Sequence, residues 1–199
     1  MRASLTLICQ GETAASRDSH FPCDDALEAR EWQRARQLQS IAARYHSVWT
    51  APETAARQTA AALSLQATPA SELADTDYGI WAGQPLREVM TQDAEAFHAW
   101  LEGAPPPGGE SRTQLLARCA TWLAQRVDIQ GRHCAVVSAA AIRAMIVDVL
   151  GAPPQSFARI DIHPLSITEL HSDGRRWHFC VLKARATGEQ TTVRPQTAS

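Results

Sequence analysis

Short apolar runs that alternate with helical stretches constrain this chain more than any other feature of its sequence. Residues 3–9 form an apolar run that ends at Gln10-Gly11, and residues 134–138 form a second run without polar alternation. A continuous apolar run of this length is typical of a strand that is buried on both faces. Strands that alternate with helices favour a parallel sheet covered on both sides. The pattern therefore predicts an α/β fold, a three-layer α/β/α sandwich with a mostly parallel central sheet.

Weaker signals place the remaining elements. Pro52 suits the first turn of a helix, Ser111 is a typical helix cap, and Asp173-Gly174 is a hairpin turn signal. We expect helices over residues 27–43, 52–62, 85–101, 111–127 and 140–150, and further strands over residues 47–50, 165–170 and 176–182. Ligands of such sheets bind beyond the carboxyl ends of the strands. The site is therefore expected where the loops after residues 9 and 138 meet.

Composition narrows the class of protein. Nineteen basic against 21 acidic residues give a net charge of −2, which offers no basic field for nucleic acid. No apolar run approaches the roughly 18–20 residues that span a membrane. Five cysteines without a CxxC spacing predict a reduced cytoplasmic protein with no metal and no cofactor. Arginine far outnumbers lysine, which indicates a bacterial source.

The same considerations predict one domain over residues 1–185, followed by a mobile polar tail over residues 186–199. A small molecule or a protein is the expected partner, and a homodimer is left open. The charged residues Arg30, Glu31, Arg34 and Arg36 are expected to form a solvated helix face.

Five blocks, in order, resemble the histidine phosphatase superfamily, whose fold is that of phosphoglycerate mutase. The first block, residues 7–13, is similar to the family's opening Leu-Ile-Arg-His-Gly-Glu-Thr. The others resemble its second block, its acid-bearing loop, its Pro-Gly-Gly-Glu-Ser block and its Val-Ser-His-Gly-Gly-Val-Ile-Arg block. They are Trp49-Thr50-Ala51-Pro52 with Arg57-Gln58-Thr59-Ala60, Asp77-Tyr78-Gly79-Ile80-Trp81-Ala82-Gly83, Pro107-Gly108-Gly109-Glu110-Ser111, and Val136-Val137-Ser138 with Ile142-Arg143 and Leu150-Gly151.

The resemblance implies phosphoryl transfer through a histidine just before the first glycine, but this chain departs from the family at that position and around it. Gln10 stands for the nucleophile, and Cys9 for the arginine beside it. Ala55 stands for the second clamping arginine, Ala139 for the second histidine, and Asp75 for the glutamate of the acid loop. A carboxamide nitrogen is delocalised into its carbonyl and does not accept a phosphoryl group. We therefore expect a degenerate member without phosphatase or mutase activity.

Four residues are candidate substitutes for the nucleophile and the cations that the family resemblance implies. Cys9 as a nucleophile is disfavoured against inert packing, because no cation remains to lower its pKa. Arg57 lies two residues beyond Ala55 on a helix and is expected to point away. For Arg143 a structural ion pair is favoured over a phosphate clamp. His20, in the loop after the first block, is weighed as a ligand contact against a solvated residue.

The expected binding pocket consists of polar, mainly neutral or acidic side chains. Gln10 both donates and accepts hydrogen bonds, which suits a neutral polar ligand, or else it fills space and bonds to the loop backbone. The leading prediction is a protein that binds a small molecule or a partner; the alternatives are a hydrolase that uses Asp75 as acid or base and an inert remnant. The predicted pocket comprises Gln10, Glu12, Thr13, His20, Asp75 and Ser138.

Overall fold

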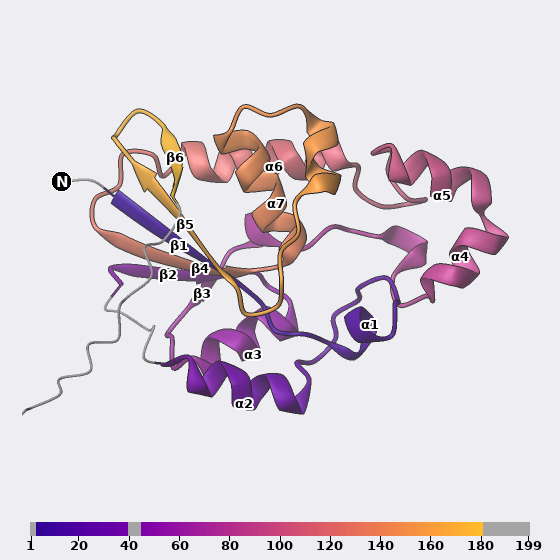
Figure 1. Cartoon of the computed structure of the whole chain (residues 1–199), viewed down its shortest axis with the longest axis horizontal. Helices are drawn as coiled ribbons and strands as arrows, with labels where there is room; N and C mark the ends of the chain where they lie inside the picture. The colour runs from indigo at the N-terminus through magenta and orange to yellow at the C-terminus, as the bar shows by residue number, and fades with distance from the viewer. Residues whose placement is uncertain (1–2, 40–44, 181–199) are drawn as a thin grey trace, which may run out of the picture.

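The computed structural model describes residues 3–39 and 45–180, which include one six-stranded sheet (Figure 1). Its strand order is β3-β2-β4-β1-β5-β6. The four strands from β3 to β1 pair in parallel, whereas β5 and β6 are antiparallel. This confirms the predicted α/β sandwich with a mostly parallel sheet. The strands are β1 (Ala3–Cys9), β2 (Ser47–Thr50), β3 (Thr68–Pro69), β4 (Arg132–Val137), β5 (Ile167–Ser172) and β6 (Trp177–Cys180).

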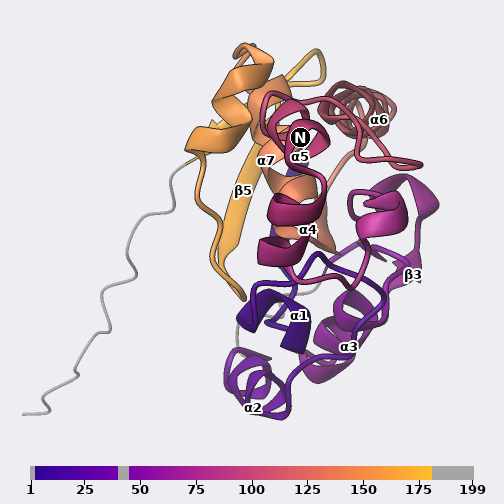
Figure 2. The same ribbon diagram turned by 90° about the vertical axis from the view of Figure 1, so that its right-hand side faces the viewer.

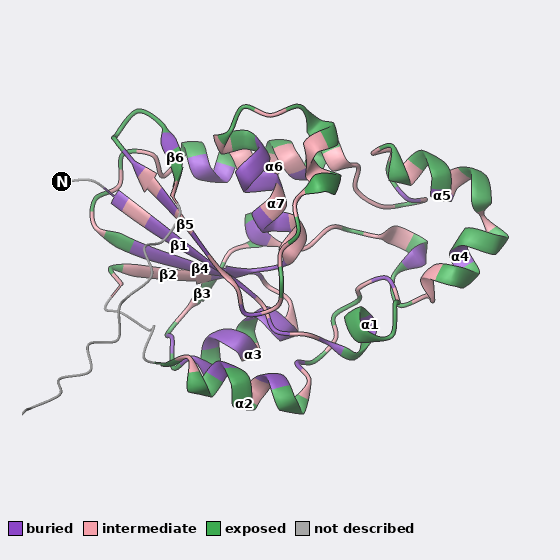
Figure 3. Cartoon of the chain, in the orientation of Figure 1, coloured by how far each residue is buried: buried purple, intermediate pink, exposed green. Residues whose placement is uncertain are grey.

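The apolar runs of β1 and β4 form the centre of the sheet. These two strands pair directly, with Leu7 opposite Ala135 and Cys9 opposite Val137. From His133 to Val137 every residue of β4 is buried, as the purple ribbon of Figure 3 shows. Helices cover both faces of these strands, so neither face needs polar side chains. Strand β5 alternates between buried and half-buried residues, as expected for a strand outside this centre.

Four longer helices make the outer layers, two on each face of the sheet (Figure 1). Helices α2 (Ala29–Gln37) and α3 (Thr54–Ala62) cover one face, and α6 (Arg112–Ala124) and α7 (Ala139–Val149) cover the other. Ser111 caps α6 as predicted, and its hydroxyl and the Gln114 side chain form a capping box. The predicted helix over 27–43 runs partly into residues that lie outside the described part, as do the end of the predicted strand 176–182 and the tail from residue 186.

Two expectations about helix boundaries are wrong. The single helix expected over 85–101 is two helices, α4 (Leu86–Gln92) and α5 (Ala94–Leu101), because Asp93 leaves the helical conformation at φ −135° and ψ 52°. Pro52 precedes the N-cap residue Glu53 of α3 and so lies outside its first turn.

A smaller group of elements lies beyond the carboxyl ends of the central strands (Figures 1 and 2). It includes the one-turn helix α1 (Ala14–Arg17), α4, α5 and the 3-10 turn η3 (Gly79–Trp81). Its apolar core is separate from that of the sheet and contains Phe21, Trp81, Val89 and Phe97. The region between this group and the sheet contains the candidate site. The other 3-10 turns are η2 (Ser71–Leu73) and η4 (Pro154–Arg159).

Candidate binding site

A cavity of about 650 Å³ opens at the carboxyl ends of β1 and β4. The loop after β1, the start of α3, residues 74–78, the start of α7 and the loop before β5 all contribute to its wall. These segments are far apart in the sequence, and parallel pairing brings the ends of β1, β2 and β4 to one edge of the sheet. The volume suits a small organic molecule, because ligand pockets usually measure roughly 300–1,000 Å³.

The loop after β1 is held so that Gln10 lines the cavity. The backbone amide of Gln10 donates to the carbonyl of Val137 at 2.9 Å, and the backbone amide of Gly11 donates to the hydroxyl of Thr59 at 3.0 Å. A Cβ at position 11 would lie 2.5 Å from Leu27 Cδ1 and 3.1 Å from Glu31 Cβ, so a larger residue there would force these side chains to shift. Gln10 Oε1 is buried and finds no donor among the described residues. The sequence left open that Gln10 fills space and bonds to the loop backbone, but this oxygen makes no such hydrogen bond.

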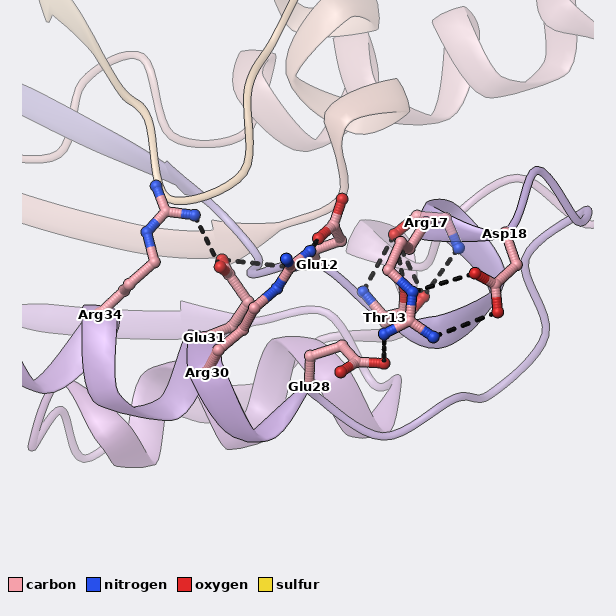
Figure 4. A network of polar contacts seen from close by, with 9 residues as sticks. Glu12, Thr13, Arg17, Asp18, Glu28, Arg30, Glu31 and Arg34 are labelled. Atoms are coloured by element: carbon pink, nitrogen blue, oxygen red, sulfur yellow. Dashed lines mark hydrogen bonds and ion pairs between the residues drawn. The ribbon is translucent and has the colours of Figure 1, made fainter.

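Helix α2 supports the same loop through charged contacts (Figure 4). Glu31 is fully buried; its Oε1 accepts from Arg34 Nη1 at 2.6 Å and its Oε2 accepts from the Glu12 amide at 3.4 Å. Arg30 forms an ion pair with the Glu12 carboxylate at the cavity wall. The expectation of a solvated face for Arg30, Glu31, Arg34 and Arg36 is therefore wrong at Glu31. Its carboxylate is buried because it anchors backbone from the loop after β1.

Two residues with carboxylate side chains, Glu53 and Asp75, lie next to each other in another part of the wall. Glu53 Oε1 accepts from the Asp75 amide at 3.0 Å, whereas Glu53 Oε2 is buried and has no donor within the described residues. Burial raises the pKa of Glu53. Burial also raises the pKa of Asp75, although the Ser138 hydroxyl and the Thr76 amide oppose part of that rise. Both groups therefore bind protons more readily than free carboxylates do.

The Pro-Gly-Gly-Glu-Ser block supports the segment that carries Asp75. Arg118 Nε and Nη2 donate to Glu110 at 3.0 and 2.7 Å. The same guanidinium donates to the carbonyls of Glu72, Ala74 and Asp75 at 2.8, 2.9 and 3.3 Å. Arg118 and Glu110 thus clamp the backbone of residues 72–75, which explains a structural role for this block.

Glycines allow the backbone at residues 79–80 to approach the backbone of the Pro-Gly-Gly-Glu-Ser block closely. The Ile80 amide donates to the Pro107 carbonyl at 3.1 Å. At Gly79, φ is +53° and a Cβ would lie 2.2 Å from the Pro107 oxygen. A residue with a side chain would be both strained and in collision there.

The junction of β4 and α7 contributes small side chains where a cation would be needed to bind phosphate. Ser138 is the N-cap of α7, and its hydroxyl accepts from the Ala141 amide at 3.2 Å. Ala139 follows it and lines the cavity, and Ala55 lines another part of the wall. Methyl groups thus occupy two positions at which the family resemblance implies an imidazole and a guanidinium.

Carboxylates dominate the charged side chains of the cavity. Arg143 is the one basic side chain among the described lining residues. An anion would therefore meet an excess of negative charge here. The carboxylates that line the cavity are Glu12, Asp24, Asp25, Glu53, Asp75 and Asp77.

Cys9 lines the cavity but is almost entirely buried. Burial raises the pKa of its thiol to about 12, and the negative charge of Asp75 acts in the same direction. The thiol stays protonated at neutral pH and is therefore a poor nucleophile.

The structure brings together five of the six residues predicted for the pocket. Gln10, Glu12, Thr13, Asp75 and Ser138 all line the cavity, and their part in binding stays a prediction. His20 does not line it; it borders a neighbouring cavity of about 210 Å³, and its Nδ1 lies 3.0 Å from the Asp18 carbonyl oxygen.

Arg143 is not in the ion pair that the sequence favours. No carboxylate of the described residues lies within 4.0 Å of its guanidinium, and its Nε is buried without a partner. Its guanidinium lies 5.8 Å from the ring centre of Phe157, and the side chain lines the cavity. Arg57, by contrast, is exposed and donates to the Thr54 hydroxyl at 3.2 Å, consistent with its expected outward direction.

Sequence reasoning missed several lining residues. Glu53 follows β2 by three residues, so the strand-end argument could have found it. Asp24 and Asp25 carry no such signal, because they reach the cavity through an irregular loop. Asp24 is fixed there by the Thr54 amide, which donates to its Oδ1 at 2.6 Å.

The described residues contain neither a candidate metal centre nor a candidate membrane span. Within residues 3–39 and 45–180, no group of three or more His, Cys, Asp or Glu side chains is placed to hold a metal ion. In the same part of the chain no helix has the length and apolar character needed to cross a bilayer.

Comparison with known proteins identifies the same group as the sequence blocks do. The sequence pattern of the histidine phosphatase superfamily (branch 1) matches residues 5–184. A bifunctional protein of Mycobacterium tuberculosis is 33% identical over 127 residues, which cover 61% of this chain and 34% of that protein. An uncharacterized protein of Mycobacterium bovis matches to the same extent. This chain thus spans about a third of the length of the curated relatives it matches.

Solved structures agree on the fold. The alpha-ribazole phosphatase of Shigella flexneri has a TM-score of 0.82 and 24% identity, with 94% of this chain and 98% of that chain covered. A mycobacterial glucosyl-3-phosphoglycerate phosphatase has a TM-score of 0.79 and 21% identity, with 91% and 98% covered. At these identities the likeness establishes the fold and nothing finer.

Proposed function

Because the chain belongs to the histidine phosphatase superfamily (branch 1) and carries Gln10 where the resemblance implies the nucleophilic histidine, we propose that it binds a ligand without phosphoryl transfer. Gln10 is the observation that carries the proposal. Its backbone is fixed by the bond to Val137, and its side chain lines the cavity without completing its hydrogen bonds. An amide at this position offers hydrogen bonding and no nucleophilic nitrogen.

The charges of the cavity support the same proposal. Phosphoryl transfer depends on positioning and on cations around the equatorial oxygens of the phosphate. Removing a single such group commonly costs about 10²–10³ in rate. Here Cys9, Ala55 and Ala139 replace three of them, and the lining carboxylates outnumber the Arg143 guanidinium that remains. The two fold neighbours described above are named as phosphatases, but the charge of this cavity disfavours a phosphate ester.

A phosphatase assay tests the proposal. The purified protein is incubated with p-nitrophenyl phosphate from about pH 4 to 9. We expect no release of p-nitrophenol above that of the protein-free buffer. Turnover that disappears in Gln10→Ala would overturn the proposal, because the reaction would then depend on this cavity.

A second candidate function is a hydrolase of different chemistry, favoured by one observation. Burial raises the pKa of Asp75, so this carboxyl group holds its proton to a higher pH than a free carboxylate and is better suited to acid or base chemistry. Any reaction of this kind should be lost in Asp75→Asn. If a reaction is found and Asp75→Asn leaves it intact, this candidate is eliminated.

A further inference from the structure

We infer that the ligand of this cavity is an organic polycation, a small molecule with two or more protonated amine or guanidinium nitrogens. This inference rests on the proposed function and adds the chemical class of the ligand. It is carried by the cavity and by the unmatched charges of its wall.

The carboxylates of the wall are mostly unpaired. Among residues 3–39 and 45–180, only Glu12 of the six lining carboxylates has an ion pair, with Arg30. Asp24 and Asp77 accept backbone amides at 2.6 and 2.8 Å, and these contacts bring no neutralising cation. The single lining guanidinium, that of Arg143, leaves an excess of negative charge. More than one positive charge is needed to balance it.

The side chains of the wall offer mainly hydrogen-bond acceptors. Six carboxylates and the Gln10 carboxamide line the cavity, against a single guanidinium, that of Arg143, among the described lining residues. Ammonium and guanidinium groups carry donors and no acceptors, which matches a wall of carboxylate and carboxamide oxygens.

The size of the site favours an organic molecule over a bare ion as its occupant. The cavity measures about 650 Å³, within the usual range for small organic ligands. The described residues offer no cluster of ligands that would hold a metal ion. An extended or branched amine fits both the volume and the spread of carboxylates over separate segments of the wall.

Isothermal titration with spermidine and with agmatine tests this inference. Inorganic phosphate and 1,4-butanediol serve as the anionic and the neutral probe. We expect at least one of the two amines to bind, and neither phosphate nor the diol to do so. Binding should weaken as salt is added, because the interaction is between charges.

Two matched variants show whether the cation binds in the cavity. Glu53→Gln keeps the acceptor for the Asp75 amide but removes a lining charge, and should weaken amine binding about tenfold. Glu95→Gln removes one charge from the exposed start of α5, outside the cavity, and should leave binding unchanged. Equal losses in both variants would mean binding to the general surface charge and would overturn the inference.

The remaining outcomes separate this inference from the proposed function. Binding of the diol but of neither amine would overturn the cationic ligand and leave a binding protein. Absence of binding by all four probes would also overturn the inference, while the phosphatase assay decides independently on catalysis. Tight binding of phosphate would overturn both.

Discussion

Two groups of half-buried polar side chains adjoin the segment 72–78, and they differ in how completely their hydrogen bonds are formed. Arg118 bonds twice to Glu110 and also to three backbone carbonyls. In the cavity, Gln10, Glu53 and Arg143 each keep a buried polar atom without a partner in the described residues. The hydrogen bonds of the Arg118 group are all formed within the chain, whereas those of the cavity group are only partly formed.

The difference separates a rigid support from a group that keeps hydrogen-bonding capacity. A buried polar network whose bonds are all made fixes a single backbone arrangement. A buried group without a partner costs roughly 1–3 kcal/mol, and Trp122 Nε1 and His133 Nδ1 show that such groups also occur outside the cavity. Here the complete group holds the loop that carries Asp75, and the incomplete group lines the cavity beside it.

The largest expected effect comes from reversing the chemistry of the cavity. In the combined variant Cys9→Arg, Gln10→His, Ala55→Arg and Ala139→His, two guanidiniums and two imidazoles return to one wall. Charge-assisted hydrogen bonds contribute about 1.5–3 kcal/mol each, so the two added guanidiniums alone should raise phosphate affinity about 10²–10⁴-fold. Titration with inorganic phosphate measures it.

Gln10→His alone is the control for that variant and should gain little, because the clamping cations are still absent. If the combined variant folds and still ignores phosphate, the cavity has lost the shape that the fold implies.

Removing Arg118 should have the largest effect on stability. Arg118→Met keeps the bulk of the side chain but leaves Glu110 and three carbonyls without their donor. We expect the free energy of unfolding to fall by about 3 kcal/mol, measured by urea denaturation. Arg57→Met, at an exposed arginine with one side-chain bond, should change it by less than about 0.5 kcal/mol. Equal effects would mean that the clamp stabilises nothing.

Glu53→Gln should change stability in a pH-dependent manner. Burial raises the pKa of Glu53 in the folded state, so the folded protein holds this proton to a higher pH than the unfolded chain does. The stability contributed by Glu53 is therefore full below its unfolded pKa of about 4.3 and is lost as the pH rises through its folded pKa. Relative to wild type, the variant should gain stability over that window, by less than about 1 kcal/mol.

Glu95→Gln is again the control for this experiment, because it removes an exposed carboxylate that lies outside the cavity. If Glu53→Gln instead lost stability relative to wild type as the pH rises, the folded protein would favour the charged form of Glu53, which would contradict the prediction. Thermal unfolding at several pH values measures both variants.

The smallest effect is expected at Arg143. Its described contacts are the packing against Phe157 and a buried Nε without a partner. Arg143→Met should not lower the free energy of unfolding and should raise it by less than about 1 kcal/mol, in contrast to Arg118→Met, because it removes a buried Nε without a partner. A loss as large as that of Arg118→Met would show that Arg143 belongs to the scaffold and not to the site.

The sequence predicts the scaffold well where local signals and the fold agree. Strand β1 coincides with the predicted run 3–9, since an apolar stretch ends sharply at Gln10-Gly11. Helix α6 begins where Ser111 and Gln114 form their capping box. The sequence does not predict the break at Asp93, because residues 85–101 have a helical composition throughout. A single aspartate within such a stretch does not indicate that one helix ends and another begins.

The cavity is less predictable, because its residues depend on contacts between distant segments. The positions of Gln10, Ala55, Asp75 and Ala139 follow from ordered blocks, and the structure places all four in one wall. Burial of Glu31 depends on the Glu12 amide, 19 residues away, and has no local signal. Asp24 and Asp25 likewise reach the cavity only through the packing of their loop.

The measurement that tests the central claim most directly is titration of the wild-type protein with inorganic phosphate and vanadate, followed by a crystal structure at high phosphate concentration. The account predicts no binding in the millimolar range and no phosphate within the cavity. A phosphate held there by Arg143 together with other arginines would contradict it, because the site would then still be built for a dianion.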